Sequence, residues 1–209
     1  AVPDLDPAAA PADWRAAVAK AAGREVPDDP WVQLEAAIRA VFDSWDGRRA
    51  RRYRAHHGIP DDLGTAVTIQ AMVFGNADQN SGTGVLFSRN PLTGAAEPYG
   101  EFLACAQGED VVSGAHTPEP LAAMAAHHPA LHDELLQAAA ALERENGDVQ
   151  DIEFTVERGR LFLLQSRSAK RAARAAVNIA VDMVHEGRIT AAQALDRVSA
   201  EQVRQLLRP

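Results

Sequence analysis

Two neighbouring segments in the last third of the chain carry polar residues at alternating positions. The first contains Asp151 and Glu153, and the second contains Gln165 and Arg167. Because successive side chains of a β-strand point to opposite faces, the two members of each pair share a face. Two carboxylates, a carboxamide and a guanidinium would suit a magnesium and phosphate site. Mg²⁺ prefers oxygen ligands, and the fixed fork of Arg fits phosphate oxygens.

The segment between the two strands decides whether these polar pairs meet. The strands are predicted at 149–156 and 161–167. A three-residue loop, Glu157–Gly159, with its glycine in the left-handed conformation, would bring both polar pairs to one face. The opposite face would then hold four apolar residues: Ile152, Phe154, Phe162 and Leu164. An even-length loop would instead set leucines opposite the acids. The alternative interpretation is a solvent-facing strand pair with a cross-strand ion pair.

A glycine-rich run is the second candidate. It reads Ser81, Gly82, Thr83, Gly84 and lies directly before a predicted apolar strand. As a loop, it would offer backbone amides and a hydroxyl to a phosphate with little steric bulk. It is not a Walker A loop, because no Gly-Lys-Ser/Thr follows, and it is not a dinucleotide fingerprint, because a strand follows it. A purely structural hairpin loop is the alternative.

The predicted elements fall into three segments, which together indicate the α+β class. Residues 1–64 are predicted to be helical, 65–169 to form strands and helices that carry the site, and 170–209 to form C-terminal helices. Helices are predicted at 14–22, 31–45, 118–127, 131–145 and 170–186, and further strands at 66–74, 84–89 and 99–104. Two capping boxes, Thr190–Gln193 and Ser199–Gln202, predict the starts of two short helices in the tail.

Composition excludes several classes of protein. Of the 209 residues, 46% are hydrophobic, which is typical of a globular protein, and the net charge of −8 argues against nucleic-acid or anionic-membrane binding. No apolar run approaches the roughly 18 residues of a membrane span. A single cysteine, Cys105, excludes an internal disulfide and fits a reducing cytosol, so we expect a cytoplasmic location. The chain opens on Ala-Val-Pro without methionine, and we expect it to be a piece of a longer protein.

A further set of short runs is specific in composition and order. They are Gln70–Asn76, Ser81–Val85, Arg89–Pro91 with Thr93–Gly94, Tyr99–Glu101, Ala106–Val112, Gln150–Phe154, and Leu164–Gln165 with Arg167. In this order they closely resemble the pyruvate, phosphate dikinase family. The similarity extends to Ala37–Phe42, Gly58–Pro60 and Ala176–Val184. The related phosphoenolpyruvate synthases share the architecture, but Ala106–Asp110 and Arg89–Pro91 fit the dikinases better.

The resemblance implies the C-terminal subdomain of an ATP-grasp nucleotide-binding domain, with a mostly antiparallel sheet flanked by helices. In that family, ATP and phosphate phosphorylate a histidine on a separate swivelling domain, and a barrel domain passes the phosphoryl group to pyruvate. The family's N-terminal ATP-grasp subdomain, with its nucleotide-binding lysines, is expected before Ala1, and the chain shows no carrier-histidine motif. The chain is therefore expected to supply half of a Mg²⁺-ATP site and to be inactive alone.

The resemblance also implies roles for residues of the two alternating strands. Asp151, Glu153 and Gln165 match positions of the magnesium-ATP site, and Arg167 matches a phosphate-contacting arginine. The run from Ser81 to Gly84, which includes Gly82 and Thr83, matches a loop near the transferred phosphates.

Other residues match positions around that site. Gln70 and Met72 match the segment that lines the adenine pocket, and Glu109 and Asp110 match catalytic acids at the rim. Two further residues match the surface where the phosphohistidine domain docks, namely Arg49 and Glu101.

Two rival functions stay open on the sequence. One is a phosphoenolpyruvate synthase-like phosphotransferase, which would use water where the dikinase uses phosphate. The other is a non-catalytic nucleotide-binding module with a degenerate site. The intact Asp151–Glu153 and Gln165–Arg167 triplets speak against the degenerate module.

Overall fold

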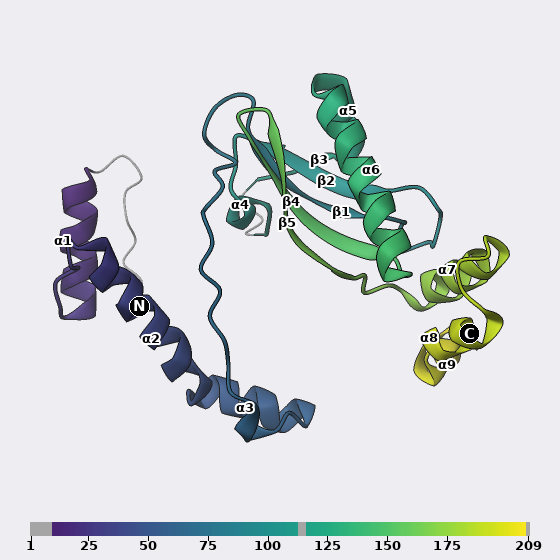
Figure 1. The fold of residues 1–209 in the computed structure, drawn as a ribbon, viewed down its shortest axis with the longest axis horizontal. Coiled ribbons are helices and arrows are strands. Elements are labelled where there is room, and N and C mark those ends of the chain that lie inside the picture. The colour runs from purple at the N-terminus through teal and green to yellow at the C-terminus, as the bar shows by residue number, and fades with distance from the viewer. Residues whose placement is uncertain (1–9, 113–115, 208–209) are drawn as a thin grey trace. The chain divides into compact units, whose positions relative to one another are not determined.

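The computed structural model describes residues 10–112 and 116–207. The first nine residues of the predicted helical segment and the last two of the tail therefore lie outside the described residues. The chain divides into two compact units, residues 1–71 and 72–209, and each is described here by itself (Figure 1).

The N-terminal unit is helical, as predicted. It consists of α1 (Pro11–Ala22), α2 (Pro30–Trp45), α3 (Arg48–His57) and the short 3₁₀ helix η1 (Asp61–Leu63). Asp29 caps α2 by accepting a hydrogen bond from the Trp31 backbone N at 2.8 Å. α3 ends at Gly58, whose φ of 64° suits glycine.

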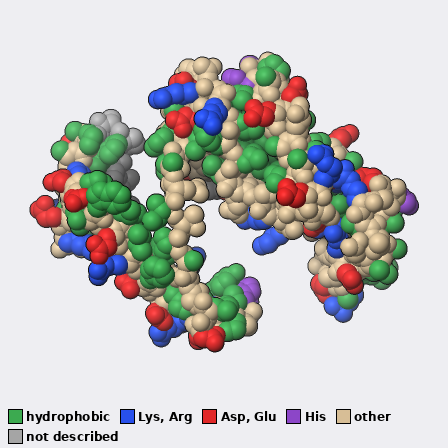
Figure 2. All heavy atoms as spheres, viewed as in Figure 1, with side chains coloured by type: hydrophobic (Ala, Val, Ile, Leu, Met, Phe, Trp, Pro, Cys, Tyr) green, Lys and Arg blue, Asp and Glu red, His purple; other side chains and the backbone are tan. Residues whose placement is uncertain are grey.

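A buried arginine on α3 forms hydrogen bonds that stabilise the connection between α2 and α3. The Arg54 side chain is only 4% exposed and donates to Asp61 Oδ1 and to the Trp45 carbonyl, both at 2.6 Å. Its guanidinium also lies 3.9 Å from the centroid of the Trp45 ring. Several large hydrophobic side chains of the unit are exposed: Figure 2 shows hydrophobic side chains gathered along these helices among charged ones, and Trp31 is 76% exposed.

The strand predicted at 66–74 is wrong. These residues form no strand in the structure and run as a segment without ladder partners. Alternating apolar residues favour an extended backbone, but a strand also requires a neighbour with which to exchange hydrogen bonds. Both sides of the first strand that follows are already occupied, by other strands.

The second unit is built on a five-stranded sheet in the order β3-β2-β1-β4-β5. All paired neighbours are antiparallel. The strands are β1 (Gly82–Phe87), β2 (Tyr99–Ala104), β3 (Glu119–Pro120), β4 (Gln150–Glu157) and β5 (Arg160–Ser168). The α+β class and the mostly antiparallel sheet are therefore confirmed.

Helices cover one face of this sheet. α4 (Gly108–Val112) follows β2, and α5 (Leu121–His127) and α6 (Pro129–Asn146) lie across the strands in Figure 1. The helix predicted from residue 118 begins three residues later, because Glu119 and Pro120 pair with β2 as strand β3. The core between sheet and helices contains Leu86, Phe102, Leu121, Met124, Leu135, Ala139, Ile152, Phe154 and Val156.

The glycine-rich run is not a loop, so that prediction is wrong. Gly82, Thr83 and Gly84 are the first three residues of β1 and are buried. A Cβ at Gly84 would lie 2.4 Å from the Glu101 carbonyl oxygen and 2.6 Å from the Phe154 ring. The glycines therefore allow the Phe102 and Phe154 rings to stack across the strand, with centroids 6.1 Å apart.

The C-terminal helices pack at the end of the sheet. They are α7 (Ala173–His185), α8 (Ala191–Arg197) and α9 (Ala200–Leu207). Their apolar contact with the strands consists of Val149, Ala169, Ala175, Ile179, Met183 and Ile189. Both capping boxes are confirmed: Gln193 N donates to Thr190 Oγ1 and Gln202 N donates to Ser199 Oγ, each at 3.2 Å.

Candidate functional site

The hairpin between β4 and β5 has a two-residue turn, so the predicted three-residue loop is wrong. Glu157 pairs directly with Arg160, which leaves only Arg158 and Gly159 in the turn. Both have positive φ, 50° and 76°. This is the requirement of a type I′ turn, whose twist matches that of the strands. Taken alone, such an even loop would set Leu164 opposite Glu153 and Ser166 opposite Asp151, in place of Gln165 and Arg167.

A β-bulge in β5 reverses that outcome. Phe154 pairs with Leu163, whereas the next residue of β4, Glu153, pairs with Gln165. Leu164 is therefore an extra residue without a partner of its own. Beyond it, Asp151 lies opposite Arg167.

The four polar residues consequently share one face, as predicted, because residues directly opposite in a ladder point the same way. Arg167 Nε donates to Asp151 Oδ2 at 2.8 Å, and Arg167 Nη2 lies 3.9 Å from Glu153 Oε1. The Asp151 side chain is 10% exposed, compared with 44% for Glu153 and 56% for Arg167. The acids thus form a surface whose deepest point is Asp151.

The four apolar hairpin residues that were predicted to share the other face do not all lie there. Ile152 and Phe154 lie on the opposite, helix-covered face, as expected. Phe162 pairs with Thr155 and therefore lies on the same face as Asp151, so its predicted placement is wrong. Leu164 was predicted to lie on the face of the sheet away from the acids. It is instead the bulge residue and is 42% exposed. The reasons differ: the two-residue turn sets Phe162 opposite Thr155, whereas the bulge removes Leu164 from the ladder.

The acidic face extends across the sheet. Glu153 pairs with Val85 of β1, and Val85 pairs with Glu101 of β2. Glu101 therefore lies in the same row as Glu153 and Gln165, two strands away from Glu153, which is about 10 Å. The predicted docking residue Glu101 thus shares a face with the predicted metal ligands.

The ion pair sets the electrostatics of this face. Hydrogen bonding to Asp151 is the main cause that raises the pKa of Arg167 above its usual value, and the charges of Asp151 and Glu153 act in the same direction. The guanidinium thus balances the charge of two carboxylates that would otherwise repel each other.

The Ser81 hydroxyl supports the hairpin turn. Ser81 Oγ donates to Asp78 Oδ1 at 2.7 Å and accepts from the Arg158 backbone N at 3.0 Å. Gly159 N donates to the Asn80 carbonyl at 2.9 Å. The backbone groups of Gly82–Gly84 face β2 and β4 on either side. Ser81 therefore stabilises the end of the β4–β5 hairpin.

Glu109 and Asp110 lie in α4 and differ in their surroundings. Asp110 Oδ2 accepts a hydrogen bond from the Gln107 backbone N at 2.8 Å, which is the geometry of a residue that closes a helix start. The Glu109 side chain is exposed.

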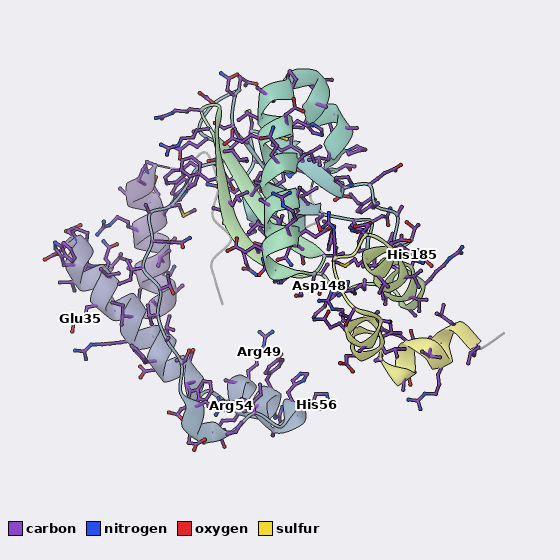
Figure 3. The ribbon with its side chains drawn as sticks, turned by 45° about the vertical axis from the view of Figure 1, so that its right-hand side comes forward. Glu35, Arg49, Arg54, His56, Asp148 and His185 are labelled. Atoms are coloured by element: carbon purple, nitrogen blue, oxygen red, sulfur yellow. The ribbon has the colours of Figure 1, made fainter. Side chains whose placement is uncertain are left out.

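The other predicted residues lie at the surface. Gln70 and Met72 are in the segment before β1, and Met72 is 67% exposed. Arg49 is exposed on α3 of the N-terminal unit, where Figure 3 labels it beside Arg54 on the same helix. Among the described residues, the N-terminal unit and the sheet unit thus each carry one predicted docking residue.

A buried charge cluster behind the sheet was missed by sequence reasoning. Arg89, which is 3% exposed, donates from Nη2 to Glu143 Oε1 at 2.9 Å and to Glu186 Oε2 at 2.6 Å. Hydrogen bonding to Glu186 is the main cause that raises the pKa of Arg89. The sequence does hold a signal: Leu135, Ala139 and Glu143 form the buried stripe of α6 at helical spacing, so Glu143 is an acid at a core position.

The donor set of the acidic face fits a magnesium ion. Mg²⁺ is usually held by one or two carboxylates together with substrate phosphates, rather than by a full protein cage. Asp151, Glu153 and the Gln165 carboxamide provide that partial set on rigid strands. Within the described ranges no group of three or more His, Cys, Asp or Glu residues could hold a metal ion by itself.

Comparison with known proteins identifies the class of this domain. The family described as "Pyruvate phosphate dikinase, AMP/ATP-binding domain" matches residues 17–133, which is more than half of the chain. The chain therefore belongs to that family.

Individual relatives match almost the whole chain. It is 53% identical over 190 residues to the chloroplastic pyruvate, phosphate dikinase of Flaveria pringlei, a match that covers 91% of this chain and 20% of the relative. It is 49% identical over 187 residues to the pyruvate, phosphate dikinase of Clostridium symbiosum, covering 90% of this chain and 21% of the relative. It is 49% identical over 208 residues to that of Rhizobium meliloti (strain 1021), covering 94% of this chain and 23% of the relative.

Two facts frame what these matches imply. The chain spans about a fifth of the length of the curated relatives it matches. With about nine-tenths of the chain covered, the matches include β4 and β5, which lie away from both ends.

Among the described helices, none is both long and apolar enough to cross a lipid bilayer.

Proposed function

We propose that this chain is a segment of a pyruvate, phosphate dikinase and supplies one wall of its Mg²⁺-ATP site. The observation that carries the proposal is the shared face of Asp151, Glu153, Gln165 and Arg167, produced by a bulge at Leu164. The family match and the names of the relatives support the same reading, since each relative is called a pyruvate, phosphate dikinase. Those names also favour the dikinase over the synthase.

Each residue has a proposed role on this wall. Asp151 and Glu153 would hold Mg²⁺ with the carboxamide oxygen of Gln165, and Arg167 would contact a phosphate oxygen. Bound Mg²⁺ would neutralise negative charge on the nucleotide phosphates. Arg167 now donates to Asp151 Oδ2. We therefore infer that the guanidinium turns from the carboxylate towards the phosphates when nucleotide and metal bind.

The rest of the predicted site is proposed to surround this wall. Gln70 and Met72, both exposed before β1, would line the adenine pocket, and the exposed Glu109 would lie at the rim of the active site. The run Ser81–Gly84 would support the wall through the contacts described above, and Asp110 would fix the start of the helix that carries Glu109.

The architecture is proposed to be half of an ATP-grasp domain. The other half, with nucleotide-binding lysines, would complete the pocket, and a swivelling phosphohistidine domain would dock near Arg49 and Glu101 to receive the phosphoryl group. The segment alone is proposed to be inactive, because phosphoryl transfer depends on positioning the nucleotide between both halves. A cytoplasmic location stays a prediction, and the plant relatives are named chloroplastic.

A magnesium titration of the 209-residue chain, followed by ¹H–¹⁵N NMR, tests the proposed wall. We expect chemical-shift changes centred on Asp151, Glu153 and Gln165, with a dissociation constant of about a millimolar, as is general for exposed oxygen sites. Adding ATP should extend the changes to Arg167 and tighten metal binding.

Matched variants make the titration specific. Asp151→Asn should abolish the changes, whereas Glu134→Gln, an exposed acid on α6, should leave them intact. Shifts that stay the same in Asp151→Asn would refute the proposed wall.

A further inference from the structure

A line of polar side chains crosses the sheet on the face opposite to the acids. Gln150 precedes Asp151 and is only 2% exposed. Its Oε1 accepts from Ser166 Oγ at 2.9 Å, and its Nε2 donates to the Asp148 carbonyl at 2.8 Å. Ser166 lies between Gln165 and Arg167. A single buried amide therefore ties together the two strands that carry the proposed site.

This line is anchored in the buried charge cluster. Gln150 N donates to Ser88 Oγ at 2.9 Å, and Ser88 Oγ donates in turn to Glu143 Oε2 at 2.5 Å. The other carboxylate oxygen of Glu143 accepts from Arg89 and Arg188 at 2.9 and 2.6 Å. The side-chain oxygen and nitrogen atoms of Gln150, Ser88 and Glu143 on this path all have hydrogen-bond partners, so these residues form a satisfied network that favours a single arrangement.

Strand β5, which this network binds through Ser166, has an alternative register. β5 pairs only with β4 among the described residues, and Leu164 sits in it as an unpaired bulge. If Leu164 entered the ladder opposite Glu153, then Ser166 would lie opposite Asp151 and Arg167 opposite Gln150. A slip of one residue thus moves Gln165 and Arg167 to the helix-covered face, because the side-chain period of a strand is two.

We propose that Gln150 and Ser166 are positioning residues that hold β5 in the bulged register and so keep Arg167 opposite Asp151. In the slipped register, Ser166 points to the acidic face and cannot reach Gln150. The hydrogen bond therefore exists only in the register that assembles the site. Its meaning for nucleotide binding rests on the proposed function.

Two serine variants on the same strand test this inference. Ser166→Ala removes the hydrogen bond to Gln150 at an exposed position, so the chain still folds. Ser168→Ala is the matched control, because Ser168 is also exposed, lies on the same face and has no side-chain hydrogen bond among the described residues. Amide hydrogen exchange, measured by NMR without nucleotide, reports how often each part of β5 leaves its pairing.

We expect Ser166→Ala to accelerate exchange about two- to tenfold, the change that corresponds to losing one hydrogen bond. The acceleration should be confined to the amides of residues 165–168 that pair with β4, and residues 160–163 should exchange as before. Ser168→Ala should match the unmodified chain. Unchanged exchange in Ser166→Ala, equal acceleration in Ser168→Ala, or acceleration spread evenly over the whole chain would each overturn the proposal.

A second measurement separates this inference from the proposed function. Magnesium titration of Ser166→Ala should show nearly unchanged affinity, because a two- to tenfold rise in a minor slipped population hardly lowers the fraction of chains in the bulged register. If the unmodified chain bound no magnesium at the acidic face while exchange behaved as expected, the proposed function would fail and the register inference would stand.

Discussion

Arg167 donates to Asp151 Oδ2 at 2.8 Å across two strands that meet in this register only because Leu164 bulges out of the ladder. The turn of the hairpin is two residues long and would by itself place Arg167 on the other face. The extra residue Leu164 therefore determines whether the Arg167 guanidinium lies on the same face as Asp151 and Glu153. The predictions that follow test what this surface and its supports do.

In a full-length dikinase that carries this segment, Glu153→Gln should slow phosphorylation of the carrier histidine about 10²–10³-fold. The substitution keeps the size of the side chain but removes one charge from the proposed metal site. Exchange between pyruvate and phosphoenolpyruvate should continue at its normal rate, because that half-reaction is proposed to use other domains. ATP-dependent labelling of the histidine and pyruvate exchange measure the two steps separately.

Glu134→Gln, on the helix that covers the opposite face, is the control and should change neither half-reaction. Equal losses in both half-reactions of Glu153→Gln would point to folding or docking rather than metal binding. No loss in either would remove Glu153 from the site.

Removing one charge of the buried cluster should destabilise the fold more than removing two paired charges together. Glu143→Leu leaves the Arg89 guanidinium buried with one carboxylate fewer and should cost about 3–5 kcal/mol in the free energy of unfolding. The double variant Arg89→Met/Glu143→Leu removes both charges, and Glu186 keeps Arg188 as its partner at 2.9 Å.

We therefore expect the double variant to be more stable than Glu143→Leu alone when both are unfolded in urea. A double variant as unstable as the sum of the two single changes would show that the side chains contribute independently. The single variant Arg89→Met completes the cycle.

Stability should fall in acid partly through Glu186. Hydrogen bonding to Arg89 is the main cause that lowers the pKa of Glu186 from its usual value of 4.5, and the charges of Arg89 and Arg188 add to it. A lowered folded-state pKa means that the stabilisation is fully present above about pH 4.5 and is lost as the pH falls through the folded-state value.

Glu186→Gln should therefore be less stable than the unmodified chain at pH 7, and the difference should shrink as the pH drops below 4.5. Urea unfolding at several pH values measures this difference. A gap that stays constant with pH would mean that Glu186 contributes through packing rather than through its charge.

Substitution of a glycine within the sheet by alanine should destabilise the fold far more than the same substitution of the glycine that begins α4. Gly84→Ala places a methyl group 2.4 Å from the Glu101 carbonyl oxygen and should cost about 1–3 kcal/mol or more. Gly108→Ala meets nothing within 4 Å and should change stability by less than about 0.5 kcal/mol. Thermal unfolding of the two variants compares them directly, and equal effects would contradict the close packing at Gly84.

The sequence predicted the polar surface better than the turn that creates it. The alternation of Asp151 with Glu153 and of Gln165 with Arg167 is a local property, and it predicted correctly which residues share a face. The turn was not predicted, because a type I′ turn with arginine at a positive φ departs from the Asn-Gly and Asp-Gly pairs that usually mark it. A bulge depends on how two strands meet, which no single strand's pattern contains.

Helix boundaries were predicted closely where the hydrophobic spacing was regular, as in α2 and α6. The segment 66–74 shows the opposite case, since its alternation favours an extended backbone but says nothing about a partner strand. Glu143 was visible in the sequence as an acid in the apolar stripe of α6, but its partners Arg89 and Arg188 lie 54 and 45 residues away. Only the fold brings these charges together.

Deleting Leu164 offers a final test of the register argument. Without the extra residue, Leu163 would still pair with Phe154 and Gln165 with Glu153, now in a regular ladder with no bulge. The slipped register would no longer exist, because no unpaired residue remains to be absorbed. We therefore expect the deletion variant to retain the Asp151–Arg167 ion pair and its magnesium-induced shifts.

In that background Ser166→Ala should lose its effect, and exchange at residues 165–168 should equal that of the deletion variant alone. The reason is that the hydrogen bond to Gln150 then has no competing register to oppose. NMR exchange on the two deletion proteins measures the difference. If Ser166→Ala still accelerated exchange severalfold there, the bond would act on the fraying of the strand end, and the bulge would have no part in it.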